Sequence, residues 1–452
     1  MLWGLAYAKR TDRLGRMNDI DVLVVGGGPA GVPAAIQAAR LGARVMLVEF
    51  HGQLGGATTT GGIFSVSLFG GFGEQLISGI GWELVEASRA LDGAARPFDP
   101  TKRGAGPRPG QTCYVNPYLY AAVAEQAVLE AGIDLRYHTA PRSAQWLEEG
   151  VVFRVDLQGK NQRTTIRCRE LIDCTGGAEI VGMLGYERVL GDEASGRRQP
   201  GTLAFEIGGF DAVAADPREI EAHYEQARAD GSLQPGDYYF ADKSGEAIAR
   251  SLQRGALNAM HVPQADDTTS DAQTVANIAG RSAMLRLLKF VRGLTGGEHA
   301  TIRYARQDTA IRETRRIVGE TTVTETDYMT GRVFPDAIGY SMWFIDIHND
   351  DHVEKRFLED GVKPTIPFSA MVPRGSRHLL APGRSISADY AALSALRVQA
   401  SCMAMGQAAG AAAALAIELG CPSRSVPHSQ LRRVLQKHGA ILPPALDRAS
   451  TT

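Results

Sequence analysis

Three glycines near the beginning of the chain carry the clearest chemical signal. Gly26, Gly28 and Gly31 form the pattern G-x-G-x-x-G. In a strand, turn and helix unit, the first glycine permits a tight turn, the second lets backbone approach a pyrophosphate, and the third lets the helix pack on the strand. Glu49 follows 21 residues after Gly28, where a carboxylate can accept hydrogen bonds from ribose hydroxyls and disfavours a 2′-phosphate. These residues predict a site for an adenine dinucleotide.

The segments around the glycines supply the elements that such a site needs. DVLVV, from Asp21, predicts a buried strand, the alanine-rich stretch that ends near Leu41 predicts a helix, and ARVMLVE predicts a second, parallel strand. The phosphates would then face the N terminus of the helix. Pro29 and Ala30 lie in the turn and belong to the predicted site. A glycine-rich turn in another kind of α/β protein would not require this combination of strand, helix, spacing and acid.

Proteins that bind NAD and proteins that bind FAD share the glycine pattern, so other segments must distinguish the two cofactors. The first is QLGGATTTGG, which follows the second predicted strand and belongs to a glycine-rich stretch predicted to be a loop. Backbone at this place can lie beside the pyrophosphate and the isoalloxazine ring of FAD. The predicted cofactor residues in it are Gly55, Gly56, Ala57 and Thr58.

Two later segments also favour FAD. LIDCTGG predicts a strand that ends in a turn at Thr175 and Gly176, about 145 residues after the glycine pattern, as in the layout of these folds. APGRSISAD precedes GQAAGAAAA, so a second helix N terminus near Ala408 to Gly410 can face a buried anion or a flavin carbonyl. FAD is therefore the predicted cofactor.

A candidate acid–base pair lies in the middle of the chain. WFIDIH alternates like a strand, which would point Asp346 and His348 to one side. A histidine with a carboxylate neighbour can accept or deliver the proton that accompanies hydride transfer, although a histidine in a structural hydrogen bond has the same pattern. His352 follows His348 by four residues, but a third well-spaced ligand is missing and we predict no metal site.

Candidate cationic groups lie on either side of this pair. RETRR places Arg312, Arg315 and Arg316 at i, i+3 and i+4, so a helix here would put them on one face. Such a face could bind a carboxylate or stabilise an anionic reduced flavin, and a solvated, salt-bridged face is the alternative. Arg397, in SALRVQASC, would face flavin or substrate, or serve packing alone.

Together these motifs resemble the FAD-dependent oxidoreductases whose single FAD domain is similar to that of fumarate reductase and glutathione reductase flavoproteins. The resemblance covers the chain from Asp21 to about Gly420 and rests on VVGGGPAGVPAAIQAARLGARVMLVE, LGGATTTGG, LIDCTGG, RETRRIVGE, WFIDIH and APGRSISADYAALSALRVQASCMAMGQAAGAAAALA. It implies hydride transfer between a small organic substrate and flavin N5. The resemblance also implies that the ribityl chain and flavin lie along Gly383, Arg384, Asp389, Gln407 and Ala408.

This chain departs from the family pattern at one place. Such proteins often have Gly-Asp-Gly after the Thr-Gly turn, whereas this chain has Gly177, Ala178 and Glu179. The resemblance therefore implies no acidic contact to the cofactor at this turn.

The predicted architecture is α/β, with a discontinuous, Rossmann-like FAD-binding domain and an inserted α+β substrate domain. A chain of 452 residues exceeds what one hydrophobic core usually serves. VVFRVDL and RTTIRCRE predict a hairpin before the LIDCTGG strand, and Asn116 with Pro117 predicts the start of a helix that stops near Gly132. The predicted parts are 1–16, a disordered or mis-assigned extension; 17–185 and 376–425, the FAD-binding domain; 186–375, the substrate domain; and 426–452, a tail.

Composition limits the partners. Hydrophobic residues make up 44% and charged residues 22% of the chain, which is typical of globular proteins, and the apolar stretch Cys402 to Leu419 predicts a buried helix rather than a membrane span. The net charge of -2 supplies no broad basic surface for nucleic acid. Five scattered cysteines without C-x-x-C fit a reducing compartment, so we expect a cytoplasmic protein.

Two alternatives to the hydride-transfer enzyme stay open. One is a flavoprotein monooxygenase that uses NAD(P)H and oxygen, although the missing second G-x-G-x-x-G disfavours a dedicated NAD(P)H domain. The other is a non-catalytic protein whose dinucleotide is structural or regulatory. The near-neutral charge disfavours an RNA-modifying flavoprotein. The electron acceptor or donor is undetermined, and a homodimer is compatible with the composition.

Overall fold

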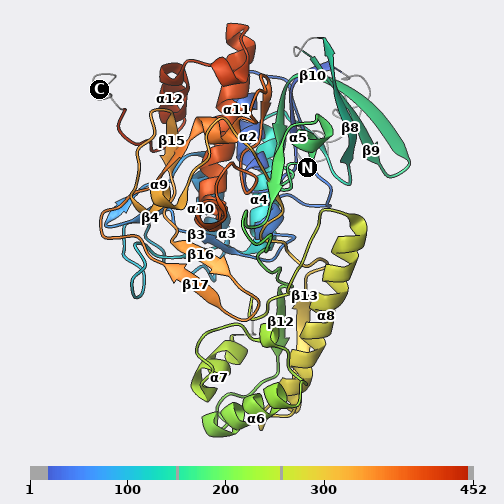
Figure 1. Ribbon diagram of the computed structural model, residues 1–452, viewed down its shortest axis with the longest axis vertical. Helices are drawn as coiled ribbons and strands as arrows, with labels where there is room; N and C mark the ends of the chain where they lie inside the picture. Colours follow the sequence, from blue (N-terminus) through green and yellow to red (C-terminus); the bar gives the residue numbers. More distant parts are fainter. Residues whose placement is uncertain (1–18, 149–151, 255–257, 446–452) are drawn as a thin grey trace.

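The structure, a computed structural model, describes residues 19–148, 152–254 and 258–445 (Figure 1). A seven-stranded sheet lies at its centre, with the order β7-β2-β1-β10-β9-β8 and with β19 paired to β10. The strands are β1 (Asp19–Val25), β2 (Val45–Val48), β7 (Asp134–Arg136), β8 (Ala140–Glu148), β9 (Val152–Gly159), β10 (Gln162–Asp173) and β19 (Leu379–Leu380). The predicted extension at residues 1–16 lies outside the described residues.

The central part of the sheet is parallel. β1 pairs in parallel with β2 and β10, and β7 and β19 continue the parallel part on the two sides. Residues 22–25 of β1 are buried, as expected of a parallel sheet covered on both faces. This arrangement confirms the predicted Rossmann-like α/β fold and the parallel strands on either side of the glycine turn.

β10 is longer than the sequence patterns indicated. Residues 162–168 form the predicted antiparallel hairpin with β9, and residues 167–173 pair with β1. The hairpin strand and the LIDCTGG strand are therefore one continuous element. Its carboxyl end lies at the same edge of the sheet as the turn after β1, because the two strands run in parallel.

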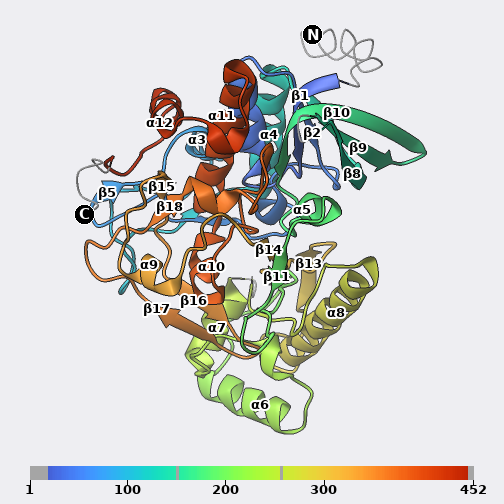
Figure 2. The same ribbon diagram turned by 45° about the horizontal axis from the view of Figure 1, so that its top comes forward.

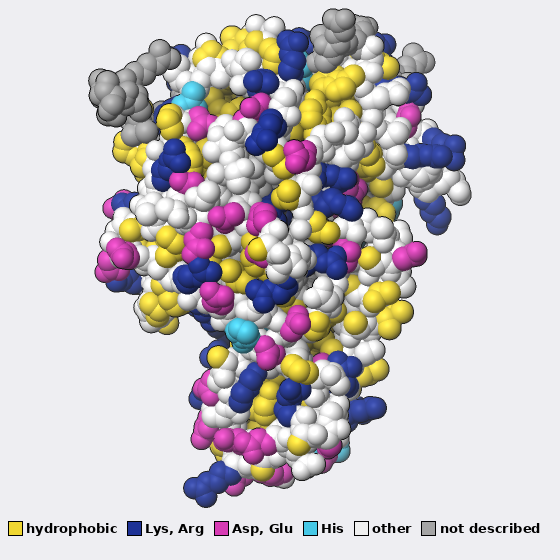
Figure 3. Space-filling model, viewed as in Figure 1, with side chains coloured by type: hydrophobic (Ala, Val, Ile, Leu, Met, Phe, Trp, Pro, Cys, Tyr) yellow, Lys and Arg dark blue, Asp and Glu magenta, His cyan; other side chains and the backbone are white. Residues whose placement is uncertain are grey.

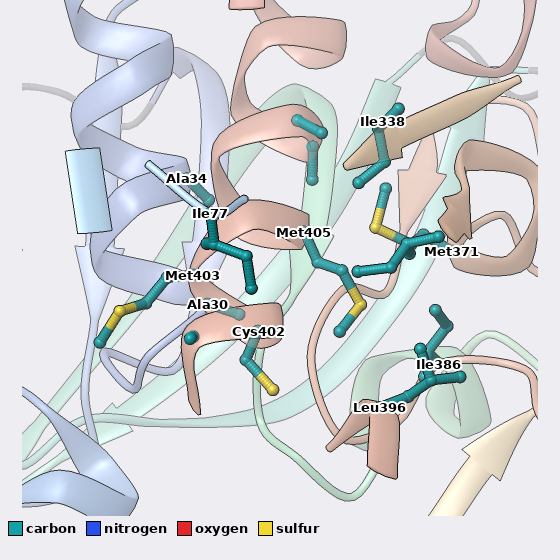
Figure 4. Packing of buried hydrophobic residues seen from close by; sticks show 14 of the residues in the cluster. Ala30, Ala34, Ile77, Ile338, Met371, Ile386, Leu396, Cys402, Met403 and Met405 are labelled. Carbon is teal, nitrogen blue, oxygen red and sulfur yellow. The ribbon is translucent and has the colours of Figure 1, made fainter. Parts of the chain in front are cut away.

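Two helices, α2 (Gly31–Arg40) and α11 (Gln399–Leu419), pack directly against each other (Figures 1 and 4). A Cβ atom at Gly406 would lie 1.9 Å from the carbonyl oxygen of Ala30, and one at Gly410 would lie 2.1 Å from that of Ala34. Only glycine allows this approach. The stretch from Cys402 is buried as predicted, and the helix begins three residues earlier, at Gln399.

Three more helices contribute to this first core: α3 (Ile80–Leu91), α4 (Pro117–Glu130) and α12 (His428–Lys437). The predicted start of α4 is confirmed, since Asn116 Oδ1 accepts a 3.0 Å hydrogen bond from the Tyr118 N–H and Pro117 occupies the first helical position. Leu431 and Leu435 of α12 are buried in the same core.

A second core occupies the lower part of the molecule in Figure 1. Its buried side chains come from residues 203–311. Many of them lie on β12 (Phe205–Gly208), α6 (Pro217–Ala229), α7 (Gly245–Gln253) and α8 (Ser270–Arg292), and the partly buried Ile302 of β13 (Thr301–Ala305) packs against them. This part is inserted between two stretches of chain that build the first core.

The two cores divide the chain differently from the predicted domain bounds. The prediction placed residues 186–375 in one inserted domain, whereas buried side chains from Val323 to Val372 pack in the first core. The reason is that β15 (Ala337–Tyr340) lies against α11. β11 (Arg188–Leu190) and β14 (Arg315–Ile317) pair where the two parts meet (Figure 2).

The remaining elements are short. The strands are β3 (Ser65–Ser67), β4 (Gly70–Gly71), β5 (Glu74–Gln75), β6 (Cys113–Tyr114), β16 (Ile345–His348), β17 (Val353–Arg356) and β18 (Thr365–Pro367). The helices are α5 (Glu179–Met183), α9 (Glu325–Met329) and α10 (Tyr390–Leu396), and the 3-10 helices are η1 (Gly56–Thr58), η2 (Pro235–Asp237), η3 (Phe368–Met371) and η4 (Ser423–Ser425).

Surface charge and apolar surface agree with the composition. Basic and acidic side chains are interspersed over the face seen in Figure 3. Within the described ranges, α11 is the one helix long and apolar enough to cross a membrane, and 89% of its most apolar stretch is buried inside the protein. The first core therefore covers the apolar surface of α11.

Candidate cofactor and active site

The glycine turn between β1 and α2 leaves no room for side chains at two of its positions. Gly26 has φ +102°, and a Cβ atom there would lie 2.3 Å from the carbonyl oxygen of Cys174. A Cβ atom at Gly31 would lie 1.7 Å from the carbonyl oxygen of Gly26. The carboxyl ends of β1 and β10 and the start of α2 therefore meet at van der Waals distance, as the sequence pattern predicts.

Gly28 differs from these two glycines because the space beside it is open. A Cβ atom at Gly28 would have a single neighbour within 4 Å, the Cα atom of Gly56 at 3.9 Å. No side chain caps the first turn of α2, which starts after Pro29 and Ala30 and contains no acidic residue. Uncapped N–H groups beside open space suit a pyrophosphate. The turn thus fits the diphosphate of FAD.

Glu49 is held beside this turn at the end of β2. Its Oε2 accepts a 2.7 Å hydrogen bond from the Gly27 N–H, and its Oε1 accepts from the His51 N–H at 2.7 Å and lies 2.9 Å from His51 Nδ1. A carboxylate has about four lone-pair positions, so ribose hydroxyls can still donate to it. The hydrogen bond to Glu49 raises the pKa of His51, against the effect of burial.

The loop after β2 connects the glycine turn to α11. Gly55 and Gly56 have φ +106° and +48°, and a Cβ atom at Gly56 would lie 2.9 Å from the Cα atom of Gly28. Ala57 is exposed, whereas Thr58 is buried and its hydroxyl donates to Gln399 Oε1. The predicted cofactor loop therefore reaches the N terminus of α11.

The second helix N terminus lies at Gln399 rather than near Ala408. The helix already includes residues 399–401, so Gln407 and Ala408 lie in its middle and are buried. Gln407 Oε1 accepts from the Ile80 N–H at 3.0 Å, and its Nε2 donates to Gln37 Oε1 at 3.1 Å. Gln407 thus ties α11 to α2 and α3. The predicted helix start near Ala408 was wrong, and the flavin contacts implied for Gln407 and Ala408 stay predictions.

Other predicted cofactor residues gather at the end of β10. Gly383 has φ +96°, and a Cβ atom there would lie 3.2 Å from Ala30 Cβ, which places Gly383 beside the start of α2. The carbonyl oxygen of Gly176 accepts a 2.9 Å hydrogen bond from Arg384 Nε. The hydroxyl of Thr175 donates to Asp173 Oδ1 at 2.7 Å. These residues line the edge of the sheet where the glycine turn lies.

Two residues implied by the resemblance are committed to protein partners. Arg384 also donates from Nη1 to the carbonyl oxygen of Ile311 at 2.5 Å, and its Nη2 lies 3.1 Å from Asp267 Oδ2. Asp389 caps α10, because its Oδ1 accepts from the Ala392 N–H at 2.8 Å. Both side chains therefore hold elements together at the site.

Asp346 and His348 lie together on β16, as the alternation predicts. Asp346 Oδ2 is 3.2 Å from His348 Nε2 and accepts a 3.3 Å hydrogen bond from Trp343 Nε1. Burial would raise the pKa of Asp346, but His348 and Arg397 hold it well below its usual range. Burial and the charge of Arg312 lower the pKa of His348 to about 3. At neutral pH the pair consists of a carboxylate and a neutral imidazole.

Arg397 joins this pair to the N terminus of α11. Its Nη2 donates to Gln199 Oε1 at 3.0 Å and lies 3.4 Å from the carbonyl oxygen of Asp346. Gln199 Oε1 also accepts a 3.2 Å hydrogen bond from the His348 N–H. Because Gln399 follows two residues after Arg397, the acid–base pair and the cofactor loop meet at the start of one helix.

The RETRR segment is not helical, and its arginines separate. Arg312 donates to the carbonyl oxygen of Pro200 at 2.6 Å, and its charge acts on both His261 and His348. Arg315 begins β14, and Arg316 is fully buried, with Nε donating to the carbonyl oxygen of Ala388 at 2.6 Å. Of these three arginines, Arg312 is the one whose charge acts on the acid–base pair.

Two members of this cluster have no local sequence signal. His261 Nε2 lies 2.8 Å from His348 Nδ1, and the ring of Tyr239 stacks on that of His261 at 3.8 Å between centroids. His261 and His348 are 87 residues apart. His352 instead pairs with Asp351 at 2.7 Å on the exposed side of the hairpin.

Comparisons with known proteins place the chain among flavoproteins. A family model described as FAD dependent oxidoreductase matches residues 21–435. The chain is similar to aklavinone 12-hydroxylase DnrF of Streptomyces peucetius subsp. caesius, with 27% identity over 183 residues, 35% of this chain and 36% of that protein. It is similar to thiamine thiazole synthase of Aeropyrum pernix, with 36% identity over 117 residues, 25% of this chain and 35% of that protein. The matches span about a third of the length of these relatives.

Two solved structures also match the chain. A geranylgeranyl bacteriochlorophyll reductase-like protein from Thermoplasma acidophilum matches with 15% identity and a TM-score of 0.42, over 93% of this chain and 83% of that chain. The p-nitrophenol 4-monooxygenase PnpA from Pseudomonas putida DLL-E4 matches with 11% identity and a TM-score of 0.41, over 92% and 84% of the two chains.

Proposed function

The chain belongs to the FAD dependent oxidoreductase family, and from this premise we propose that it transfers a hydride between a small organic substrate and FAD. When bound, FAD supplies the hydride chemistry at N5 of its isoalloxazine ring. The observation that carries the proposal is the Asp346–His348 pair, which Arg397 connects to the helix start beside the cofactor loop.

The cofactor residues would hold FAD through backbone rather than charge. The uncapped first turn of α2 and the space beside Gly28 would take the diphosphate. Glu49 would accept the ribose hydroxyls. The start of α11, next to Thr58, would direct its N–H groups towards the flavin end.

The acid–base residues would manage the proton that accompanies the hydride. Asp346, ionised, holds the His348 ring in one orientation, and this carboxylate–imidazole pair would take a proton from a hydroxyl or amine group of the substrate. Arg312 and Arg397 lie beside the pair and would attract a substrate with an anionic or oxygen-rich group.

The test is anaerobic bleaching of the flavin by small alcohols, amines and hydroxy acids, in matched histidine variants. We expect His348→Asn to keep its FAD and to slow bleaching about 100-fold or more, since a general base contributes about 10² to 10⁴. His352→Asn is the matched control, because His352 lies on the same hairpin with its own aspartate and is exposed. Equal bleaching rates in wild type and His348→Asn would refute the assigned role of His348.

A second candidate is a flavoprotein monooxygenase, favoured by the partial identity to a hydroxylase. Its signature would be oxygen-dependent NAD(P)H consumption that a substrate stimulates, without anaerobic bleaching by the substrate alone. If neither a substrate nor dithionite reduces the bound flavin at ordinary rates, the dinucleotide has a structural or regulatory role instead.

A further inference from the structure

His51 lies between the predicted ribose acid, Glu49, and the second part of the molecule. Its Nδ1 is 2.9 Å from Glu49 Oε1, and its Nε2 is 3.7 Å from Asp308 Oδ2. Glu49 directly follows β2, whereas Asp308 follows β13 in the stretch of chain that builds the second core. One imidazole ring therefore faces a carboxylate from each part of the molecule.

Asp308 is held in place by α8. Its Oδ1 accepts a 2.7 Å hydrogen bond from Asn277 Nδ2, and Asn277 Oδ1 accepts a 2.7 Å hydrogen bond from the Thr309 N–H. The hydroxyl of Thr309 donates to the carbonyl oxygen of Ala276 at 3.0 Å. Because Ala276 is buried in the second core, the position of Asp308 follows that of α8 and of this core.

The second part also lies against the predicted cofactor loop, QLGGATTTGG. A Cβ atom at Gly61 would lie 3.4 Å from Ala310 Cβ. A Cβ atom at Gly62, which has φ +72°, would lie 2.7 Å from Ala204 Cβ and 2.8 Å from Arg306 Cγ. The N–H of Arg306 donates to the carbonyl oxygen of Ala204 at 2.9 Å. The end of the cofactor loop and residues 306–310 are therefore in close contact.

The protonation state of His51 decides whether its ring attracts Asp308. The Glu49 carboxylate only accepts, so His51 Nδ1 carries a proton in both the neutral and the charged ring. In the neutral ring Nε2 presents a lone pair to the Asp308 carboxylate, whereas in the charged ring it presents an N–H. His138 is a further titratable residue beside His51, and its backbone N–H donates to the His51 carbonyl oxygen at 3.3 Å.

The two carboxylates favour the charged ring. The hydrogen bond from His51 to Glu49 and the charges of Glu49 and Asp308 raise the pKa of His51, against the effect of burial. A raised pKa means that the stabilisation is fully present below the ordinary pKa of histidine and is lost as the pH rises through the raised value. The attraction between His51 and Asp308 therefore belongs to the acidic side of the pKa of His51.

We propose that His51 is a positioning residue of the cofactor site: it orients the Glu49 carboxylate towards the ribose and, through Asp308, links FAD binding to the docking of the second core. This inference rests on the cofactor residues of the proposed function. In the docked arrangement, residues 306–310 hold the cofactor loop and Asp308 holds the ring, so FAD binds this arrangement more tightly than an opened one. Because linked equilibria are reciprocal, bound FAD stabilises the docking of the second core.

The first measurement is the affinity of the apoprotein for FAD, by fluorescence titration. His51→Ala removes the side-chain donor to Glu49, so we expect the affinity to fall about threefold to tenfold. His51→Asn places an amide N–H near the position of Nδ1, so its affinity should stay within about twofold of wild type. Phe50→Ala is the control, since Phe50 is the neighbouring residue and is 66% exposed. Equal affinities of His51→Ala and wild type, or of His51→Ala and His51→Asn, would overturn the role at Glu49.

The second measurement is hydrogen exchange with and without FAD, at about pH 6, where His51 is charged. We expect bound FAD to slow exchange in α8 and residues 306–311 of the wild type about fivefold. Asp308→Asn and His51→Asn should lower this factor to about two or less, because the ion pair is missing. Asp271→Asn is the control, since Asp271 is an exposed acid in the first turn of α8. Equal FAD-dependent slowing in Asp308→Asn and wild type would overturn the link.

The titration of His51 checks the contact with Asp308 directly. NMR titration of the apoprotein, with His51→Asn to assign the ring signals, should give His51 a pKa above its ordinary value of 6.5. The pKa should be lower in Asp308→Asn, because one of the two negative charges beside the ring is removed. The same pKa of His51 in both proteins would show that Asp308 does not act on the ring and would overturn the link.

The two proposals can fail separately, because none of these measurements requires turnover. If no small molecule bleaches the flavin while the affinities, the exchange rates and the titration come out as expected, the proposed reaction fails and the role of His51 remains. If His348→Asn slows bleaching as expected while His51→Ala binds FAD as tightly as wild type, the proposed function stands and His51 has no part in holding FAD.

Discussion

At the scale of single residues, the site depends on where side chains are missing. The glycine turn contains positions that no side chain can occupy, such as Gly31, and one position, Gly28, where a methyl group would meet only ordinary contact. This difference separates folding from cofactor binding. Gly31 serves the packing of α2 on β1, whereas Gly28 keeps space free beside the helix N terminus.

Gly28→Ala is expected to fold normally and to bind FAD about tenfold or more weakly, a loss of about 1.4 kcal/mol or more, because the methyl group would occupy the diphosphate space. Fluorescence titration of the apoprotein with FAD measures the affinity, and thermal unfolding of the apoprotein checks the fold. Gly93→Ala is the control, since a Cβ atom there meets nothing within 4 Å. Equal FAD affinities of the two variants would contradict the assignment.

At the scale of elements, α11 combines two roles. Its first turn lies beside the cofactor loop through Gln399 and Thr58, and its middle lies directly on α2 through Gly406 and Gly410. Figure 4 shows how side chains around this contact, including Met403 and Met405, fill the core beside it. The position of the helix start therefore depends on the glycine contacts further along the same helix.

Gly406→Ala tests this packing by the sign of its effect. In an isolated helix the change from glycine to alanine stabilises by about 1 kcal/mol. Here the added Cβ atom would lie 1.9 Å from the carbonyl oxygen of Ala30, so we expect the free energy of unfolding to fall by about 1 to 3 kcal/mol. Urea unfolding measures it. Glu418→Ala, at the exposed end of α11, should change it by less than about 0.5 kcal/mol. A more stable Gly406→Ala variant would contradict the packing.

At the scale of the whole molecule, the second core must dock on the first for His261 to contact His348. Arg384 is one connection between them, because it comes from the first core and donates to the carbonyl oxygen of Ile311 and to Asp267. β11 and β14 pair in the same region (Figure 2). The contact between His261 and His348 depends on this docking.

We expect Arg384→Ala to lower the free energy of local unfolding of the second core by about 1 to 3 kcal/mol, since the carbonyl and carboxylate partners of Arg384 lose their donor. Hydrogen exchange should become faster across residues 203–311 and stay unchanged in β1 and β10. Arg303→Ala is the control, because Arg303 makes an exposed ion pair with Glu206 within the second part. Equal exchange in Arg384→Ala and wild type would exclude this role.

The sequence by itself determined the features that arise from neighbouring residues. The glycine turn, its two parallel strands, Glu49, the cap at Asn116 and the strand pair Asp346 and His348 all lie within short segments. Backbone conformation and strand alternation dictate such local geometry, so the shape of these segments could be predicted.

Only the tertiary structure decided the features that depend on distant packing. A helix for RETRR agreed with its spacing, but its last two residues pair with β11 as part of β14, and Arg316 is buried. Gln407 became a core residue because α11 starts at Gln399, and Val323 to Val372 joined the first core because β15 lies on α11. His261 meets His348 across 87 residues. Burial and contact between segments far apart depend on how whole elements pack, and no local pattern encodes that packing.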